Sequence, residues 1–115
     1  MTTLSYTLLI NNGPDQGDQQ ARALRFAHAL LQRGHNLRRV FFYGSAVSTA
    51  LPNHASVAAC WQALLGNEDS ETELCLCSAS AERLGVSHAP DRFIIAGLGS
   101  LIEAGFDSDR VITCD

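Results

Sequence analysis

Val40-Phe41-Phe42-Tyr43, closed by Gly44-Ser45, is the stretch that decides the fold of this chain. Every position of the run is apolar or aromatic, whereas a strand with one face in water alternates apolar and polar residues. Continuous apolarity is typical of a strand covered on both faces, as in parallel sheets flanked by helices. The run therefore predicts a central strand of an α/β protein.

The segments before this run supply another strand and a helix. Residues 6–10 are rich in β-formers and end at the turn sequence Asn-Asn-Gly-Pro. Asp18 is expected to cap a helix over residues 19–33, and Gly34 is expected to end it. The apolar residues of that helix follow the spacing of one helical face; they are Ala23, Phe26, Ala27, Leu30 and Leu31.

The residues after the run continue the alternation of helices and strands. The expected elements as far as residue 84 are a loop with a helical turn over 45–53, a helix over 56–65, an acidic surface loop over 67–71, a strand over 73–77 and a short helix over 78–84. They are followed by a strand or helix lead-in over 93–96, a helix over 97–105 and a strand over 110–113. The helix over 97–105 carries Leu98, Leu101 and Ile102 on one face. Such alternation requires crossover connections and a mostly parallel sheet. The predicted fold is a three-layer α/β/α sandwich of flavodoxin-like arrangement, formed by residues 1–115 as one domain.

Composition narrows the class of protein. The chain has 115 residues and a formal net charge of −4, and all eight of its basic residues are Arg. This balance argues against a protein that binds nucleic acid on its own. No apolar run reaches the length of a membrane span, and the start does not have the pattern of a signal peptide. We therefore expect a cytoplasmic protein whose four cysteines are reduced.

Cys77 is the candidate catalytic residue. The carboxyl ends of parallel strands hold the functional crevice in open α/β sheets, and residues 11–18, 43–47 and 77–80 follow such ends. Cys77 also precedes a predicted helix, whose first amides favour a thiolate, the nucleophile of sulfur transfer. Ser78 and Ser80 offer hydroxyl hydrogen bonds to it. The alternative is a small, buried and inert cysteine.

The other three cysteines are better explained by packing or by chance. Cys75 faces the same side of its strand as Cys77, with their Cα atoms about 6.6 Å apart, at the upper edge for a disulfide. Packing is favoured for it over a resolving role. Cys60, beside Trp61, is expected in the core. Cys114 is read as an incidental exposed thiol, with a second sulfur acceptor as the alternative.

No metal or phosphate site is indicated. The only close cysteine pair is C-x-C and the four histidines are scattered, whereas structural zinc needs four convergent ligands. The loop over residues 11–18 lacks both Gly-rich phosphate motifs and carries Asp15 and Asp18, so a turn lining a pocket is favoured. We expect a structural role for His35 at a helix end, and His88 is a candidate base for Cys77.

Several stretches, in order along nearly the whole chain, match one known family. They are Gly13-Pro14, residues 19–21, residues 26–30, Gly34-His35, residues 39–43 with VFFY, Trp61, residues 76–86 with Cys77 and an Arg-containing turn ended by glycine, residues 97–104, and residues 109–112. Together they resemble the DsrE/TusD family of sulfurtransferases, and within it the TusD-like subunits of the tRNA 2-thiouridine relay.

The resemblance implies a function and partners. A cysteine at the position of Cys77 accepts sulfur as a persulfide from an upstream carrier. It passes that sulfur toward an enzyme that thiolates the wobble uridine of tRNA. The resemblance implies no cofactor, a heterohexamer with TusB-like and TusC-like subunits, and no stable nucleic-acid contact. Related proteins with this architecture serve sulfur oxidation.

Two departures and two alternative functions accompany the resemblance. The segment between Val86 and Gly97 is shorter than in typical TusD-like chains, and the turn after Tyr43 reads Gly-Ser-Ala-Val. One alternative is a non-catalytic scaffold subunit of the same type of complex. The other is a flavodoxin-like domain whose small-molecule pocket is lined by residues 11–17 and 43–47.

Overall fold

The computed structural model describes residues 2–66 and 70–114. Five strands form one sheet: β1 (Ser5–Ile10), β2 (Asn36–Phe42), β3 (Glu73–Cys77), β4 (Phe93–Ala96) and β5 (Arg110–Thr113). The helices are α1 (Gln19–Gln32), α2 (Ala55–Leu65), α3 (Ser78–Leu84) and α4 (Leu98–Asp107), with two 3₁₀ helices, η1 (Gly44–Ala50) and η2 (Pro52–His54). The expected acidic loop over residues 67–71 lies mostly outside the described residues.

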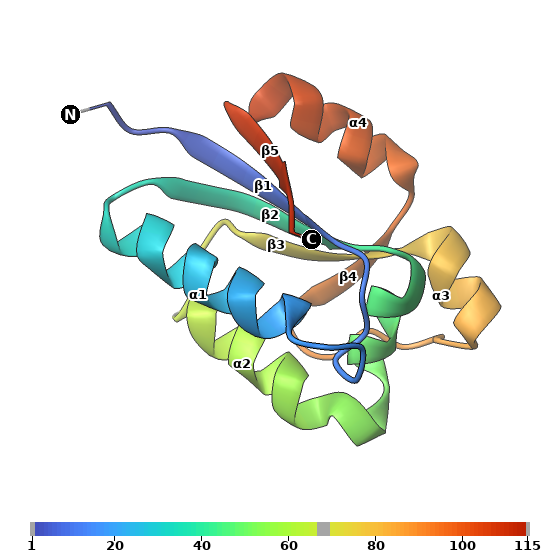
Figure 1. Ribbon diagram of the computed structural model, residues 1–115. Coiled ribbons are helices and arrows are strands. Elements are labelled where there is room, and N and C mark those ends of the chain that lie inside the picture. Colours follow the sequence, from blue (N-terminus) through green and yellow to red (C-terminus); the bar gives the residue numbers. More distant parts are fainter. Residues whose placement is uncertain (1, 67–69, 115) are drawn as a thin grey trace.

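The sheet is parallel throughout, in the order β4-β3-β2-β1-β5. α1 and α2 cover one face, α4 covers the other, and α3 lies near the carboxyl end of β3 (Figure 1). The predicted three-layer α/β/α arrangement is therefore confirmed. The strand order differs from the flavodoxin-like order 2-1-3-4-5, so the likeness to that fold is limited to the layers.

The core forms around the central strand β2, which contains Val40, Phe41 and Phe42. Val40, Phe41 and Phe42 have no exposed surface, because helices cover both sides of β2. The Phe42 ring meets Trp61 of α2 edge-on at 5.4 Å between centroids and Phe93 of β4 at 5.6 Å. The continuous apolar run is thus explained by burial on both faces.

The ends of α1 differ in how well the sequence predicted them. Gly34 follows the helix with φ +83, and the N–H groups of Gly34 and His35 donate to the carbonyls of Leu31 and Leu30 at 3.0 Å each. These two bonds make the Schellman motif expected of a terminal glycine. Asp18 occupies the expected N-cap position, but its side chain caps no amide and pairs with Arg22 at 3.0 Å instead.

The face of α4 that carries Leu98 and Ile102 is exposed. Leu98, Ile102 and Phe106 expose 58%, 65% and 88% of their surfaces, while Leu101 is half-buried and Ala104 is buried. The helix therefore turns Leu101 and Ala104 toward the sheet. Its apolar stripe of Leu98, Ile102 and Phe106, at i, i+4 and i+8, faces outward, and we call these three residues the α4 stripe.

Candidate active site

Cys77 stands where β3 ends and α3 begins. It pairs with Ala96 in the parallel register of β3 and β4, and it exposes 5% of its surface. The predicted junction of strand and helix is therefore present. Its position fixes the backbone of Cys77 in the sheet and leaves the sulfur beside the first turn of α3.

Ser80 links this turn to the neighbouring strand end. Its hydroxyl oxygen accepts a hydrogen bond from the Gly44 N–H at 2.9 Å and another from Nη2 of Arg83 at 3.2 Å. Gly44 has φ +56, a left-handed conformation that glycine adopts at little cost. Ser80 itself is 3% exposed, and the contact joins the first residue of η1 to α3.

The surroundings of Cys77 act on its acidity in opposite directions. Burial by itself raises the pKa of the thiol. Hydrogen bonding from the Ser80 side chain, the backbone amides of Ser80 and Ala79, and the charge of Arg83 all lower it, and the net pKa lies below its ordinary value. A lowered pKa increases the thiolate fraction near neutral pH, which is the reactive form of cysteine.

The other cysteines lie in three different environments. Cys75 has no exposed surface, and burial raises its pKa to about 11, which confirms its expected packing role. The expected burial of Cys60 is wrong, because it is exposed. Neighbouring helix residues lie about 100° apart, so the burial of Trp61 turns Cys60 to the flank of α2. Cys114 is half-buried at the end of β5.

The loop after β1 is held by glutamine side chains. Oε1 of Gln19 accepts from the N–H groups of Asn11 and Asn12 at 3.2 and 2.8 Å, and Oε1 of Gln16 accepts from the Gly13 N–H at 2.7 Å. A phosphate would need these same amides. The loop is therefore unsuited to cradle one, as the sequence analysis expected.

The same loop packs closely on η1. A Cβ added to Gly13 would lie 2.8 Å from Oγ of Ser48 and 3.1 Å from the carbonyl oxygen of Ser45, so a side chain has no room there. The three strand-end segments predicted from the sequence are thus brought together. The close contact at Gly13 argues against the alternative of a flavodoxin-like pocket between the first two segments.

The two singled-out histidines do not reach Cys77 through any described contact. Nδ1 of His35 accepts a hydrogen bond from the Leu4 N–H at 3.1 Å, and its ring packs edge-on against Tyr6. Its role is structural as expected, although its partner is the amide that precedes β1 and not the helix carbonyls. His88 is exposed between α3 and β4, and it is not among the groups that shift the pKa of Cys77.

Within residues 2–66 and 70–114, no cluster of three or more histidine, cysteine or acidic side chains is placed to hold a metal ion. In the same part of the chain, none of the helices has the length and apolarity needed to cross a membrane.

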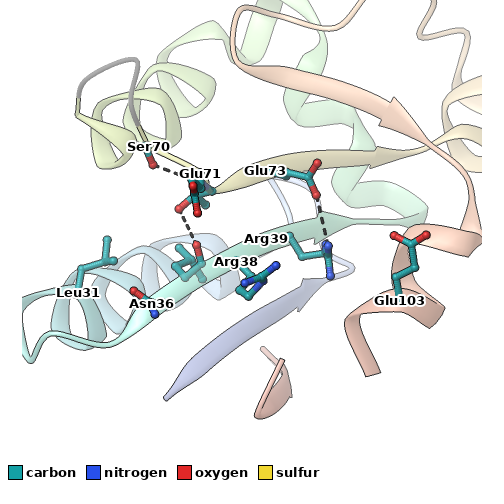
Figure 2. Close-up of a pocket in the computed structure, with 10 residues that line it drawn as sticks. Leu31, Asn36, Arg38, Arg39, Ser70, Glu71, Glu73 and Glu103 are labelled. Carbon is teal, nitrogen blue, oxygen red and sulfur yellow. Dashed lines mark hydrogen bonds and ion pairs between the residues drawn. The ribbon is translucent and has the colours of Figure 1, made fainter. Parts of the chain in front are cut away.

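A cavity of about 590 Å³ lies at the opposite end of the sheet, near the amino ends of β2 and β3 (Figure 2). Its charged lining residues are Arg38, Arg39, Glu71, Glu73 and Glu103. Arg39 is already neutralised, since it pairs with Glu73 at 3.4 Å and with Asp107 at 2.9 Å. The cavity therefore offers mixed charge far from the strand ends where α/β sheets place their chemistry.

Sequence reasoning named Ser80 but missed its two partners. Gly44 was interpreted as the residue that closes a strand, and Arg83 as part of a short helix and of the Arg-containing turn that resembles the family. An arginine two residues before a terminal glycine was only a weak sequence signal for the contact with Ser80. The contact of Ser80 with Gly44 depends on β2 and β3 lying side by side in the sheet. Local sequence patterns do not show which strands are neighbours.

Residues 5–114 match the family model of the DsrE/DsrF-like family. This chain belongs to that family. Among curated members, it is 40% identical over 129 residues to the protein named "Sulfurtransferase TusD" of Pectobacterium carotovorum, which covers 95% of this chain and 98% of the relative. It is 30% identical over 128 residues to the "Putative sulfurtransferase DsrE" of Allochromatium vinosum, covering 95% of this chain and 97% of the relative.

One solved structure shares the fold of this chain, and the alignment with a relative is longer than the chain itself. The crystal structure of the ychN protein from E. coli superposes with a TM-score of 0.73 at 24% identity, covering 96% of this chain and 99% of that one. This likeness concerns the fold. The alignment of 129 positions is longer than the 115 residues of this chain, so the Pectobacterium relative has extra internal residues. The segment between Val86 and Gly97 stays our predicted place for the difference.

Proposed function

We propose that this chain carries sulfur as a persulfide on Cys77 and passes it between partner proteins, toward the 2-thiolation of tRNA wobble uridine. The observation that carries the proposal is the position of Cys77 at the end of β3, with a pKa lowered by Ser80, the first amides of α3 and Arg83. A structural cysteine such as Cys75 has the opposite tendency, with a raised pKa.

The class of activity follows from the family. Relatives that match nearly the whole chain are named sulfurtransferases, and this chain is a sulfurtransferase of the same family. The persulfide on Cys77 and the tRNA destination are the parts that we propose.

The transfer steps need no oxidant. The Cys77 thiolate attacks the outer sulfur of a donor persulfide, so that a new S–S bond forms on Cys77 while the donor's S–S bond breaks. The donor leaves as a thiolate. In the second step an acceptor thiolate attacks the outer sulfur of the Cys77 persulfide, and Cys77 returns to its thiolate. Each step exchanges one S–S bond for another.

Protein partners are part of the proposal. We infer that TusB-like and TusC-like subunits join this chain in a heterohexamer and that upstream and downstream carriers visit Cys77. The exposed α4 stripe supports a protein contact, because large apolar side chains gathered on one helix face are unusual on a monomer. The net charge of −4 suits a relay between proteins that leaves tRNA contact to a later enzyme, in the cytoplasm, where thiols stay reduced.

A scaffold role without sulfur chemistry is the main alternative. The low exposure of Cys77 favours it, while the lowered pKa favours a reactive thiol. A role in sulfur oxidation shares the same persulfide chemistry and differs in its acceptor.

Onward transfer of labelled sulfur separates these possibilities. The protein, assembled with its partner subunits, is loaded from a persulfide donor and then mixed with acceptor proteins of the tRNA and of the oxidation type. We expect Cys77→Ser to abolish transfer, whereas Cys60→Ser, which removes an exposed thiol, should transfer normally. Transfer that survives in Cys77→Ser would contradict the proposal, and a folded wild-type complex that transfers no sulfur would favour the scaffold.

A further inference from the structure

The hydroxyl of Ser80 accepts two hydrogen bonds, and its own hydrogen still needs an acceptor. A serine hydroxyl has one hydrogen to donate and two lone pairs to accept with. Both acceptor positions are used, by the Gly44 N–H at 2.9 Å and by Arg83 at 3.2 Å. The remaining group is the hydroxyl hydrogen itself.

The surroundings of that hydrogen restrict where it points. Ser80 is 3% exposed, so water has little access to it, and a buried hydroxyl hydrogen without an acceptor is costly. The two incoming N–H groups occupy the lone-pair side of the oxygen. The hydrogen must therefore point away from Gly44 and Arg83.

The Cys77 sulfur is the acceptor that the chain places next to the first turn of α3. Cys77 precedes α3 directly, and Ser80 is the third residue of that helix. In the capping box, the residue before a helix and the third residue of that helix exchange hydrogen bonds between side chain and backbone, so side chains at these two positions lie near each other. Cys77 is also buried, so the two groups share one dry environment.

We propose that Ser80 is a positioning residue for Cys77: its hydroxyl, oriented by Gly44 and Arg83, donates to the Cys77 sulfur and stabilises the thiolate. The inference deepens the proposed function, on which its role in sulfur transfer rests. Ser78 provides the contrast, because it carries the same hydroxyl one residue from Cys77 but is exposed. The direction in which the Cys77 pKa is shifted agrees with this assignment.

The test is the pH dependence of Cys77 alkylation by iodoacetamide, followed on the Cys77 peptide by mass spectrometry. The midpoint of the profile reports how readily the thiolate forms, while the plateau at high pH reports access to the sulfur. A structural role for Ser80 would change the plateau or the thermal stability. A role in holding the thiolate changes the midpoint.

We expect Ser80→Ala to move the midpoint to higher pH and to slow alkylation at pH 7 roughly tenfold, since a hydrogen bond to a charged group is lost. Ser78→Ala is the matched control and should keep the wild-type midpoint. If Ser80→Ala does not fold, Ser80→Thr and Ser80→Val make the same comparison, because they differ in the hydroxyl and hardly in shape. Ser80→Thr should then titrate at lower pH than Ser80→Val.

A wild-type midpoint in Ser80→Ala, or an equal shift in Ser78→Ala, would overturn the inference. Sulfur loading of the wild-type protein is measured in parallel. If Cys77 accepts no sulfur but the midpoint still shifts in Ser80→Ala, the proposed function fails while the Ser80–Cys77 contact stands. If Cys77 accepts sulfur but the midpoint does not shift in Ser80→Ala, the proposed function stands while the Ser80–Cys77 contact fails.

Discussion

Cys75 and Cys77 lie two residues apart on β3, and their thiols differ in acidity because their surroundings differ. Burial raises the pKa of Cys75 to about 11, with no described hydrogen bond to offset it. Cys77 is near the strand end, where burial is opposed by Ser80, two amides and Arg83. A shift of two residues along one strand thus separates a thiol with a raised pKa from one with a lowered pKa.

The alkylation pattern of the native protein should reflect this difference. At pH 8, we expect iodoacetamide to modify Cys77 and the exposed Cys60, while Cys75 stays unmodified because it is both buried and protonated. Peptide mass spectrometry before and after unfolding checks this, and all four cysteines should react once the chain is unfolded. Modification of Cys75 in the folded protein would show that β3 opens.

Gln20 is the buried side chain on which the packing of α1, α2 and η1 converges. It accepts from Nε1 of Trp61 at 3.1 Å and donates to Oγ1 of Thr49 at 2.8 Å and to the Asn12 carbonyl at 3.0 Å. We expect Gln20→Leu to lower the free energy of unfolding by about 2–4 kcal/mol, since several buried groups lose their partner. Denaturant unfolding measures this, with Gln32→Leu at the exposed end of the same helix as the control. A loss of under about 0.5 kcal/mol would be the value of a surface site and would contradict this account.

At the scale of elements, the sequence predicted the order of helices and strands well, because apolar period and terminal glycines are local signals. β3 and α3 have the predicted bounds. The outward turn of α4 was not predicted, since amphipathicity shows that a helix has an apolar face but not what covers it. Burial of Arg39 was also missed, because its partners come from α4 and from the neighbouring strand β3.

Asp107 fastens the end of α4 to the sheet through Arg39. The carboxylate binds both Nη atoms of Arg39, at 2.9 and 3.1 Å, and the pKa of Asp107 is lowered chiefly by these hydrogen bonds. Because Asp107 is 32% exposed and Glu73 also contacts Arg39, we expect Asp107→Asn to cost about 2 kcal/mol, less than a fully buried pair. Thermal and denaturant unfolding measure the loss.

The pH dependence gives this pair a second test. The pKa of Asp107 is lower in the folded state than in the unfolded chain, so its contribution is complete above the ordinary Asp value of about 3.9. The contribution is lost as the pH falls from there through the lowered folded value. Asp107→Asn should lack this part of the acid sensitivity, while Glu103→Gln on the exposed side of α4 should keep it. Identical acid profiles for wild type and Asp107→Asn would exclude a stabilising ion pair.

At the scale of the whole molecule, the two ends and the two faces of the sheet have separate roles. The strand ends near Cys77 hold the candidate site, and the cavity of mixed charge lies at the other end. α1 and α2 close one face of the sheet, whereas α4 leaves its stripe exposed on the other (Figure 1). This outward stripe is where we expect partner subunits to contact the molecule.

A charged residue in the α4 stripe should weaken assembly without unfolding the chain. We expect Ile102→Glu to lower the fraction that co-purifies with TusB-like and TusC-like subunits at least tenfold, because burying an unpaired carboxylate at an interface is costly. Size-exclusion chromatography with light scattering measures the complex. Ala29→Glu, on the exposed face of α1, is the matched control. Normal assembly of Ile102→Glu would place the interface elsewhere.

The measurement that tests the central claim most directly is the mass of the Cys77 peptide after the reduced protein meets a persulfide donor and is trapped with an alkylating agent. Our account predicts the added mass of one sulfur atom on Cys77, with Cys60, Cys75 and Cys114 unchanged. Sulfur on Cys60 or Cys114 with none on Cys77, in a protein assembled with its partner subunits, would contradict it.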